Sequence, residues 1–189
     1  MIEQYAKDVI LTKNGSSEKL NSTKANFCLV IIKYFDPSSK SDNLLNTIRS
    51  IEWAIKQNVD VINYSGGGTQ FSAKEKEQVI AALNKGIKFV AAAGNERSNI
   101  DEHRYYPAMY DNRIFVVGNL VKSKVRLPSA IKDIDVSPTS NWGSSVNTWE
   151  VGTNILSRLP GNSFGFMTGT SQACAIKSGK MVREMLLKQ

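Results

Sequence analysis

The segment Gly169-Thr170-Ser171 offers a hydroxyl nucleophile at the predicted start of a helix. Free N–H groups and the positive end of the helix dipole favour an oxyanion at such a position. A second segment, Ala91-Ala92-Ala93-Gly94-Asn95, ends a predicted strand, and its asparagine amide is a donor that can also face an oxyanion. The first setting suits a nucleophile and its oxyanion, and the second suits a donor to an oxyanion. Taken alone, however, each segment also fits a plainer interpretation, an N-capping serine and a turn-forming asparagine.

A third segment, Ser65-Gly66-Gly67-Gly68, follows another predicted strand. Its glycines leave backbone N–H and C=O groups accessible, which suits pairing with an extended peptide. A phosphate cradle is disfavoured because the segment has neither GKS/T nor GxGxxG spacing. A simple tight turn remains the alternative.

These segments need a scaffold that brings strand ends together, and the rest of the sequence predicts one. Short apolar runs alternate with helical periodicity, which favours a parallel sheet covered by helices. Ligands of such sheets bind beyond the carboxyl ends of the strands. The predicted strands are Phe27–Phe35, Val59–Tyr64, Ile87–Ala93, Ile114–Val117 and Trp149–Val151.

Helix signals lie between these strands. Apolar residues at helical spacing from Leu44 to Ile55 predict one helix, with Asn58 as a left-handed stop. Ser72 and Glu75 form a capping-box pattern that opens a second helix, and Gly86 ends it. The last helix follows Ser171.

Composition excludes several classes of protein. The chain has 189 residues, 41% hydrophobic and 22% charged, as in a globular domain, and no apolar run approaches the ~18 residues that span a bilayer. The net charge is +7, but the basic residues are scattered along the chain and are not interleaved with aromatic residues, so nucleic-acid binding is disfavoured. The two cysteines, Cys28 and Cys174, fit no metal spacing and are predicted to be small buried residues.

In their order and spacing, the three glycine-containing segments resemble those of the subtilisin-like serine proteases. The resemblance runs from Phe27 to Gly179 and includes IEWAIKQNVDVINYSGGG, FVAAAGNE and LPGNSFGFMTGTSQA. It implies a three-layer α/β fold with a parallel sheet, N-terminally incomplete relative to the family. Residues 1–189 are expected to form a single peptidase domain, with 1–26 as an N-terminal helix and polar loop and 27–189 as the core.

The resemblance also implies roles for individual residues. Ser171 would be the nucleophile, and the Asn95 amide together with the Ser171 N–H would form the oxyanion hole. Ser65, Gly66 and Gly67 would pair with an extended peptide or protein substrate. The pocket for the substrate side chain before the scissile bond would be walled by Ala91, Ala92, Ala93 and Gly94, with Gly169 and Thr170 completing the substrate-binding segment. No cofactor, metal, nucleic acid or membrane partner is expected.

The sequence departs from the family at three points. Gly66 stands where the family usually has Leu, and Ala175 where it usually has Pro. The third departure is larger: the catalytic Asp and His should precede Phe27, yet the only histidine is His103. Without a base, Ser171 would be a weak nucleophile, so the chain alone is expected to be close to inactive.

Two accounts explain this gap. In the first, Met1–Leu11 is the helix that follows the catalytic His, and the chain is part of a truncated or split protease. In the second, Val9–Gly15 is a decayed Asp strand with Lys13 in place of Asp, and the protein is a pseudoprotease that binds peptides or proteins. In the first account, a companion fragment or self-association could complete the sheet.

Overall fold

The computed structural model describes residues 27–33, 43–121 and 135–187. Four strands form one parallel sheet in the order β1-β2-β3-β4: β1 (Val61–Tyr64), β2 (Lys88–Ala92), β3 (Phe115–Leu120) and β4 (Thr148–Val151). The register pairs Tyr64 with Ala91 and Ala92 with Val117. The carboxyl ends of β1 and β2 therefore lie side by side, as the sequence predicts.

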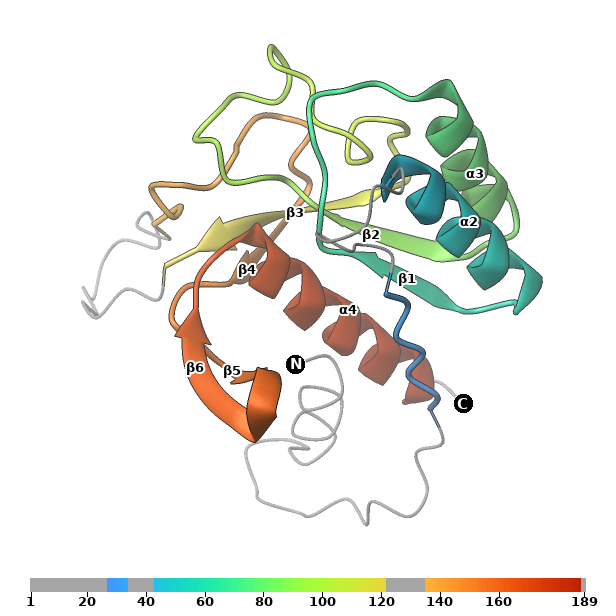
Figure 1. The fold of residues 1–189 in the computed structure, drawn as a ribbon. Coiled ribbons are helices and arrows are strands. Elements are labelled where there is room, and N and C mark those ends of the chain that lie inside the picture. The colour runs from blue at the N-terminus through green and yellow to red at the C-terminus, as the bar shows by residue number, and fades with distance from the viewer. Residues whose placement is uncertain (1–26, 34–42, 122–134, 188–189) are drawn as a thin grey trace.

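Helices cover both faces of this sheet, which gives three layers (Figure 1). Helix α4 (Thr170–Leu186) packs across all four strands on one face. Helices α2 (Asn43–Lys56) and α3 (Ala73–Asn84) pack against each other on the opposite face. The predicted three-layer α/β fold is confirmed.

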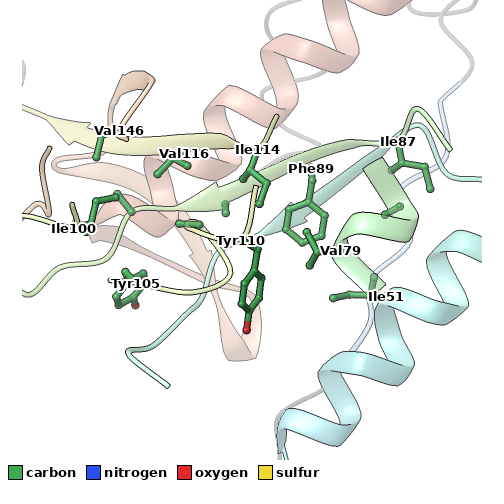
Figure 2. Close-up of a cluster of buried hydrophobic side chains, with 14 of the residues drawn as sticks. Ile51, Val79, Ile87, Phe89, Ile100, Tyr105, Tyr110, Ile114, Val116 and Val146 are labelled. Atoms are coloured by element: carbon green, nitrogen blue, oxygen red, sulfur yellow. The ribbon is translucent and has the colours of Figure 1, made fainter. Parts of the chain in front are cut away.

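The residues of β2 alternate between two hydrophobic clusters, one on each face of the sheet. Phe89 and Ala91 belong to the cluster on the side of α2 and α3, and Figure 2 shows Phe89 beside Val79 of α3. Val90 and Ala92 pack on the other side with residues of α4. A central strand buried on both faces explains why its sequence is continuously apolar.

Local signals predict the helix ends correctly. Asn58 adopts a left-handed φ of 52° after α2, and Gly86 a φ of 81° after α3. The Ser72 hydroxyl accepts a hydrogen bond from the Glu75 N–H at 3.2 Å. The other half of the predicted capping box does not form, because the Glu75 carboxylate is buried and accepts a hydrogen bond from the Tyr110 hydroxyl at 2.7 Å instead.

The predicted strand Phe27–Phe35 is wrong over its described part. Residues 27–33 have no regular secondary structure, and Ile31 is 85% exposed. Cys28, predicted to be buried, is exposed as well. An apolar run becomes a stable strand only where a neighbouring strand pairs with it, and none of the described strands does so here. The segments Met1–Leu11 and Val9–Gly15 lie outside the described residues.

A two-stranded antiparallel hairpin, which the sequence pattern did not predict, precedes α4. It consists of β5 (Ile155–Leu159), a 3-10 turn (Pro160–Asn162) and β6 (Ser163–Met167). Leu156, Phe164 and Phe166 lie exposed on it. The hairpin delivers the chain to the start of α4, where Ser171 lies.

No helix in the described part of the chain is long and apolar enough to cross a membrane.

Candidate active site

The three glycine-containing segments meet at the carboxyl edge of the sheet. Ser65 directly follows β1, the turn at Gly94 and Asn95 follows β2, and Ser171 is the second residue of α4. Since α4 packs across β1 and β2, its first turn reaches both strand ends. The structure thus brings together residues that are about one hundred positions apart in the sequence.

Ser171 and Ser65 are joined by two reciprocal hydrogen bonds. The Ser171 hydroxyl donates to the Ser65 carbonyl oxygen at 2.9 Å, and the Ser65 hydroxyl donates to the Ser171 carbonyl oxygen at 3.1 Å. The pair fixes the start of α4 against the end of β1. A carbonyl oxygen is an acceptor but not a general base, so this arrangement orients the Ser171 hydroxyl without activating it.

Asn95 is oriented by Thr170, the residue before Ser171. Its Oδ1 atom accepts hydrogen bonds from the Thr170 N–H at 2.9 Å and from the Thr170 hydroxyl at 3.2 Å. The same hydroxyl accepts a hydrogen bond from the Gly94 N–H at 3.2 Å. With Oδ1 held in this way, Nδ2 has no partner among the described residues and is available as a donor to a bound oxyanion.

The glycine segment after β1 keeps a free backbone edge. Gly68 exchanges two backbone hydrogen bonds with Tyr106, at 2.9 and 2.7 Å. Gly66 and Gly67 make no backbone hydrogen bond within the described part of the chain. A Cβ atom on Gly67 would lie 2.6 Å from the Tyr106 carbonyl oxygen, so the close approach to Tyr106 requires glycine.

The remaining candidate residues are placed as follows. The side chains of Ala91, Ala92 and Ala93 are buried in the two hydrophobic clusters, whereas Asn95, which follows them after Gly94, is exposed. Gly169 is the N-cap of α4, and its N–H donates to the Gly152 carbonyl oxygen at 3.0 Å. This bond ties the segment before Ser171 to the end of β4.

His103 lies on an exposed turn away from these contacts. Its backbone N–H donates to the Asn99 carbonyl oxygen at 2.8 Å, and no described hydrogen bond links it to Ser65 or Ser171. The described residues also hold no group of three or more His, Cys, Asp or Glu side chains that could bind a metal ion. The base that Ser171 would need is therefore not found among its described hydrogen-bond partners.

Asn63 is a further polar residue at this site, and the sequence pattern did not single it out. Its Nδ2 donates to the Ser65 hydroxyl at 2.9 Å, and its Oδ1 accepts from the Ser178 hydroxyl at 2.9 Å and from the Cys174 thiol at 3.3 Å. Burial raises the pKa of Cys174 to about 12, so the thiol is a protonated donor and not a nucleophile. The available signal was an asparagine within an otherwise apolar strand, which indicates a buried hydrogen-bond network.

The chain is similar to known proteins in both sequence and structure. The model of the Subtilase family matches residues 10–184. The chain is 31% identical over 173 residues to the "Major intracellular serine protease" of Bacillus subtilis (strain 168), an alignment that covers 90% of this chain and 51% of that protein. It is 38% identical over 146 residues to "Subtilisin E" of the same organism, with coverages of 77% and 35%.

Solved structures agree with these sequence matches. A "cold adapted subtilisin-like serine proteinase" superposes with a TM-score of 0.65 at 26% identity, covering 78% of this chain and 50% of that one. The "Prenylagaramide maturation protease PagA" shares the fold, with a TM-score of 0.67 at 22% identity and coverages of 82% and 54%. This chain spans about half or less of the length of the curated relatives described above.

Proposed function

Because the chain belongs to the subtilase family, we propose that its 189 residues form one peptidase domain that carries the nucleophile half of a serine endopeptidase. In this proposal the Ser171 hydroxyl attacks the carbonyl carbon of an extended peptide. The oxyanion that forms is held by the Asn95 Nδ2 and the Ser171 N–H, while Ser65, Gly66 and Gly67 pair with the substrate backbone. The pocket wall predicted at Ala91–Gly94 is not part of this proposal, because Ala91, Ala92 and Ala93 are at most 2% exposed and pack in the hydrophobic clusters.

One observation carries this proposal. The Asn95 Oδ1 is held by two donors on Thr170, and the Ser171 hydroxyl is fixed at the Ser65 carbonyl oxygen. The residues that hold the amide donor and the nucleophile, Thr170 and Ser171, are consecutive in the chain, which keeps the two sets of hydrogen bonds adjacent. An oxyanion hole acts by preorganisation, and side chains that are already held by hydrogen bonds support this proposal.

The catalytic His and Asp come, in this proposal, from outside the 189 residues. The only histidine, His103, lies on an exposed turn, and Ser171 faces a carbonyl oxygen. In subtilisin, loss of the histidine costs about as much turnover as loss of the whole triad, ~10⁶-fold. The chain alone is therefore expected to leave casein and peptide anilides uncut.

The unpaired edge of β1 also supports a contribution from outside these 189 residues, in this case a neighbouring strand. Among the described strands β1 is an edge strand, and residues 27–33 do not pair with it. Unpaired edges of this sort recruit strands from other chains. We propose that a companion fragment or a second copy supplies this strand. Light scattering after size-exclusion chromatography tests this, and a monomer that melts cooperatively at micromolar concentration would contradict it.

A second candidate function is favoured by the same carbonyl contact. If the Ser171 hydroxyl never meets a base, the protein is a pseudoprotease that binds extended peptides along Ser65–Gly67 by strand addition. The two functions differ in whether Ser171 can be activated, and this can be measured directly.

A fluorophosphonate probe with and without added imidazole separates the two functions. Imidazole can replace a missing histidine as a general base. The endopeptidase proposal predicts background labelling of the chain alone and a clear increase with imidazole that is lost in Ser171→Ala. The pseudoprotease predicts no increase, with peptide binding retained. Labelling that persists in Ser171→Ala would contradict both.

A further inference from the structure

Asn141 uses its whole hydrogen-bonding capacity on the turn that carries Asn95. Its Oδ1 accepts from the Glu96 N–H at 3.0 Å and from the Ser98 N–H at 2.9 Å. Its Nδ2 donates to the Ala93 carbonyl oxygen at 2.9 Å and to the Glu96 carboxylate at 2.6 Å. An asparagine amide offers two donor hydrogens and an oxygen with two lone pairs, so every site is satisfied. The residue is 1% exposed.

These contacts bracket Asn95 on both sides of the chain. Ala93 and Gly94 precede Asn95, and Glu96 follows it. The Asn141 N–H adds a fifth bond, to the Gly94 carbonyl oxygen at 2.9 Å. Gly94 adopts a φ of 100°, which favours glycine, and a Cβ atom there would collide with the Asn141 Nδ2. The turn therefore packs directly against Asn141, with no room for a side chain at Gly94.

We propose that Asn141 is a positioning residue for the oxyanion hole. It holds the Gly94–Glu96 turn in the position where Thr170 can donate hydrogen bonds to the Asn95 Oδ1. In that orientation the Asn95 Nδ2 faces the reacting carbonyl group. Thr170 orients the amide group, and Asn141 fixes the backbone from which the amide projects. The inference rests on the proposed function and adds a residue from a loop 46 positions away in the sequence. A displacement of about 1 Å at such a group can cost ~10²-fold.

The test separates oxyanion stabilisation from simple peptide binding. A peptide aldehyde forms a hemiacetal in which the Ser171 Oγ bonds to the aldehyde carbon and the Oγ proton ends on the former aldehyde oxygen. The same peptide ending in a primary alcohol binds without this bond. The ratio of the two dissociation constants reports on the nucleophile and oxyanion hole together, and it does not require a catalytic histidine.

Asn141→Asp is the informative variant. It keeps the shape and both acceptor contacts, but it places a carboxylate oxygen against the Ala93 carbonyl oxygen and the Glu96 carboxylate. We expect the aldehyde-over-alcohol ratio to fall by about 10- to 100-fold while alcohol binding changes little. Adding Glu96→Gln restores a donor at one of the two repelled contacts, so the double variant should regain part of the ratio.

Asn147→Asp is the matched control. Asn147 also clamps backbone, accepting from the Val116 N–H at 3.0 Å and donating to the Ile114 carbonyl oxygen at 2.8 Å, but at the amino ends of β3 and β4. This variant is expected to melt earlier with an unchanged ratio, because its role is structural. A folding defect in Asn141→Asp is recognised by the loss of alcohol binding, and the double variant then carries the test.

The outcomes are distinct. A reduced ratio in Asn141→Asp, partly restored in the double variant, supports the positioning role. A wild-type ratio in a folded Asn141→Asp protein, or in a folded double variant where the single variant does not fold, overturns that role and leaves the proposed function intact. A wild-type chain that binds aldehyde and alcohol equally overturns the proposed function and the positioning role with it.

Discussion

Replacing Thr170 by valine removes one hydroxyl from the centre of the site while keeping the shape of the side chain. That hydroxyl accepts from the Gly94 N–H at 3.2 Å and donates to the Asn95 Oδ1 at 3.2 Å, and Thr170 is fully buried. Valine leaves the Gly94 N–H without its partner, which costs about 1–3 kcal/mol for a buried donor. The Asn95 Oδ1 keeps only its bond to the Thr170 N–H, so its amide is less firmly oriented.

Thr170→Ser is the matched control, because it keeps the hydroxyl and deletes one methyl group. Its cost should be about 0.5–1.5 kcal/mol, as for other single-methyl deletions in a core. Urea unfolding measures both losses of stability, and the peptide aldehyde and alcohol pair measures the site. We expect the aldehyde preference to fall in the valine variant and to persist in the serine variant. The opposite pattern would refute the role assigned to the hydroxyl.

Three further predictions follow from buried contacts. Asn63→Leu should lower the free energy of unfolding by about 1–3 kcal/mol in urea melts, because three hydrogen bonds lose a partner; an unchanged midpoint would contradict the network. Burial and the neighbouring Glu75 raise the pKa of Tyr110 above its usual 10.0. The unfolded chain therefore loses this proton first, and stability should fall more steeply above about pH 10 in wild type than in Tyr110→Phe; parallel pH profiles would contradict this. Phe89→Ala should cost about 3–5 kcal/mol and Phe166→Ala, at a 73% exposed residue, less than about 0.5; similar losses would contradict the burial pattern.

Local sequence signals were sufficient for most of the fold. The stops at Asn58 and Gly86 depend on residues that tolerate a left-handed φ, and the cap at Ser72 depends on a hydroxyl three residues before an N–H. Such signals act within one turn of chain, so a single sequence can reveal them. Buried parallel strands can be predicted equally well from the sequence, because they are apolar on both faces and therefore continuously apolar.

The features that could not be predicted from the sequence depend on contacts between residues that are far apart in the chain. The apolar run Phe27–Phe35 predicts a strand, but strand formation requires a neighbour, and none of the described strands pairs with its described part, residues 27–33. The Glu75 carboxylate leaves its expected capping role for a tyrosine 35 residues away. The sequence pattern did not predict the hairpin of β5 and β6, because Ser157, Arg158 and Gly165 interrupt its apolar residues and Pro160 and Gly161 separate its strands.

The candidate site divides in the same way. The segments at Ser65, Asn95 and Ser171 can be recognised in the sequence by their glycines, their small residues and their order along the chain. The structure brings them together. Asn63 and Asn141 gave no comparable signal, because each works through hydrogen bonds to segments that only folding brings near.

The most direct test of the central claim is the carbon-13 spectrum of a peptide aldehyde labelled at its carbonyl carbon and bound to the purified chain. Ser171 next to a preformed oxyanion hole predicts a hemiacetal signal in wild type, a weaker one in Asn95→Leu, and none in Ser171→Ala. A wild-type spectrum that shows only free aldehyde and its hydrate, or a hemiacetal that survives in Ser171→Ala, would contradict the account.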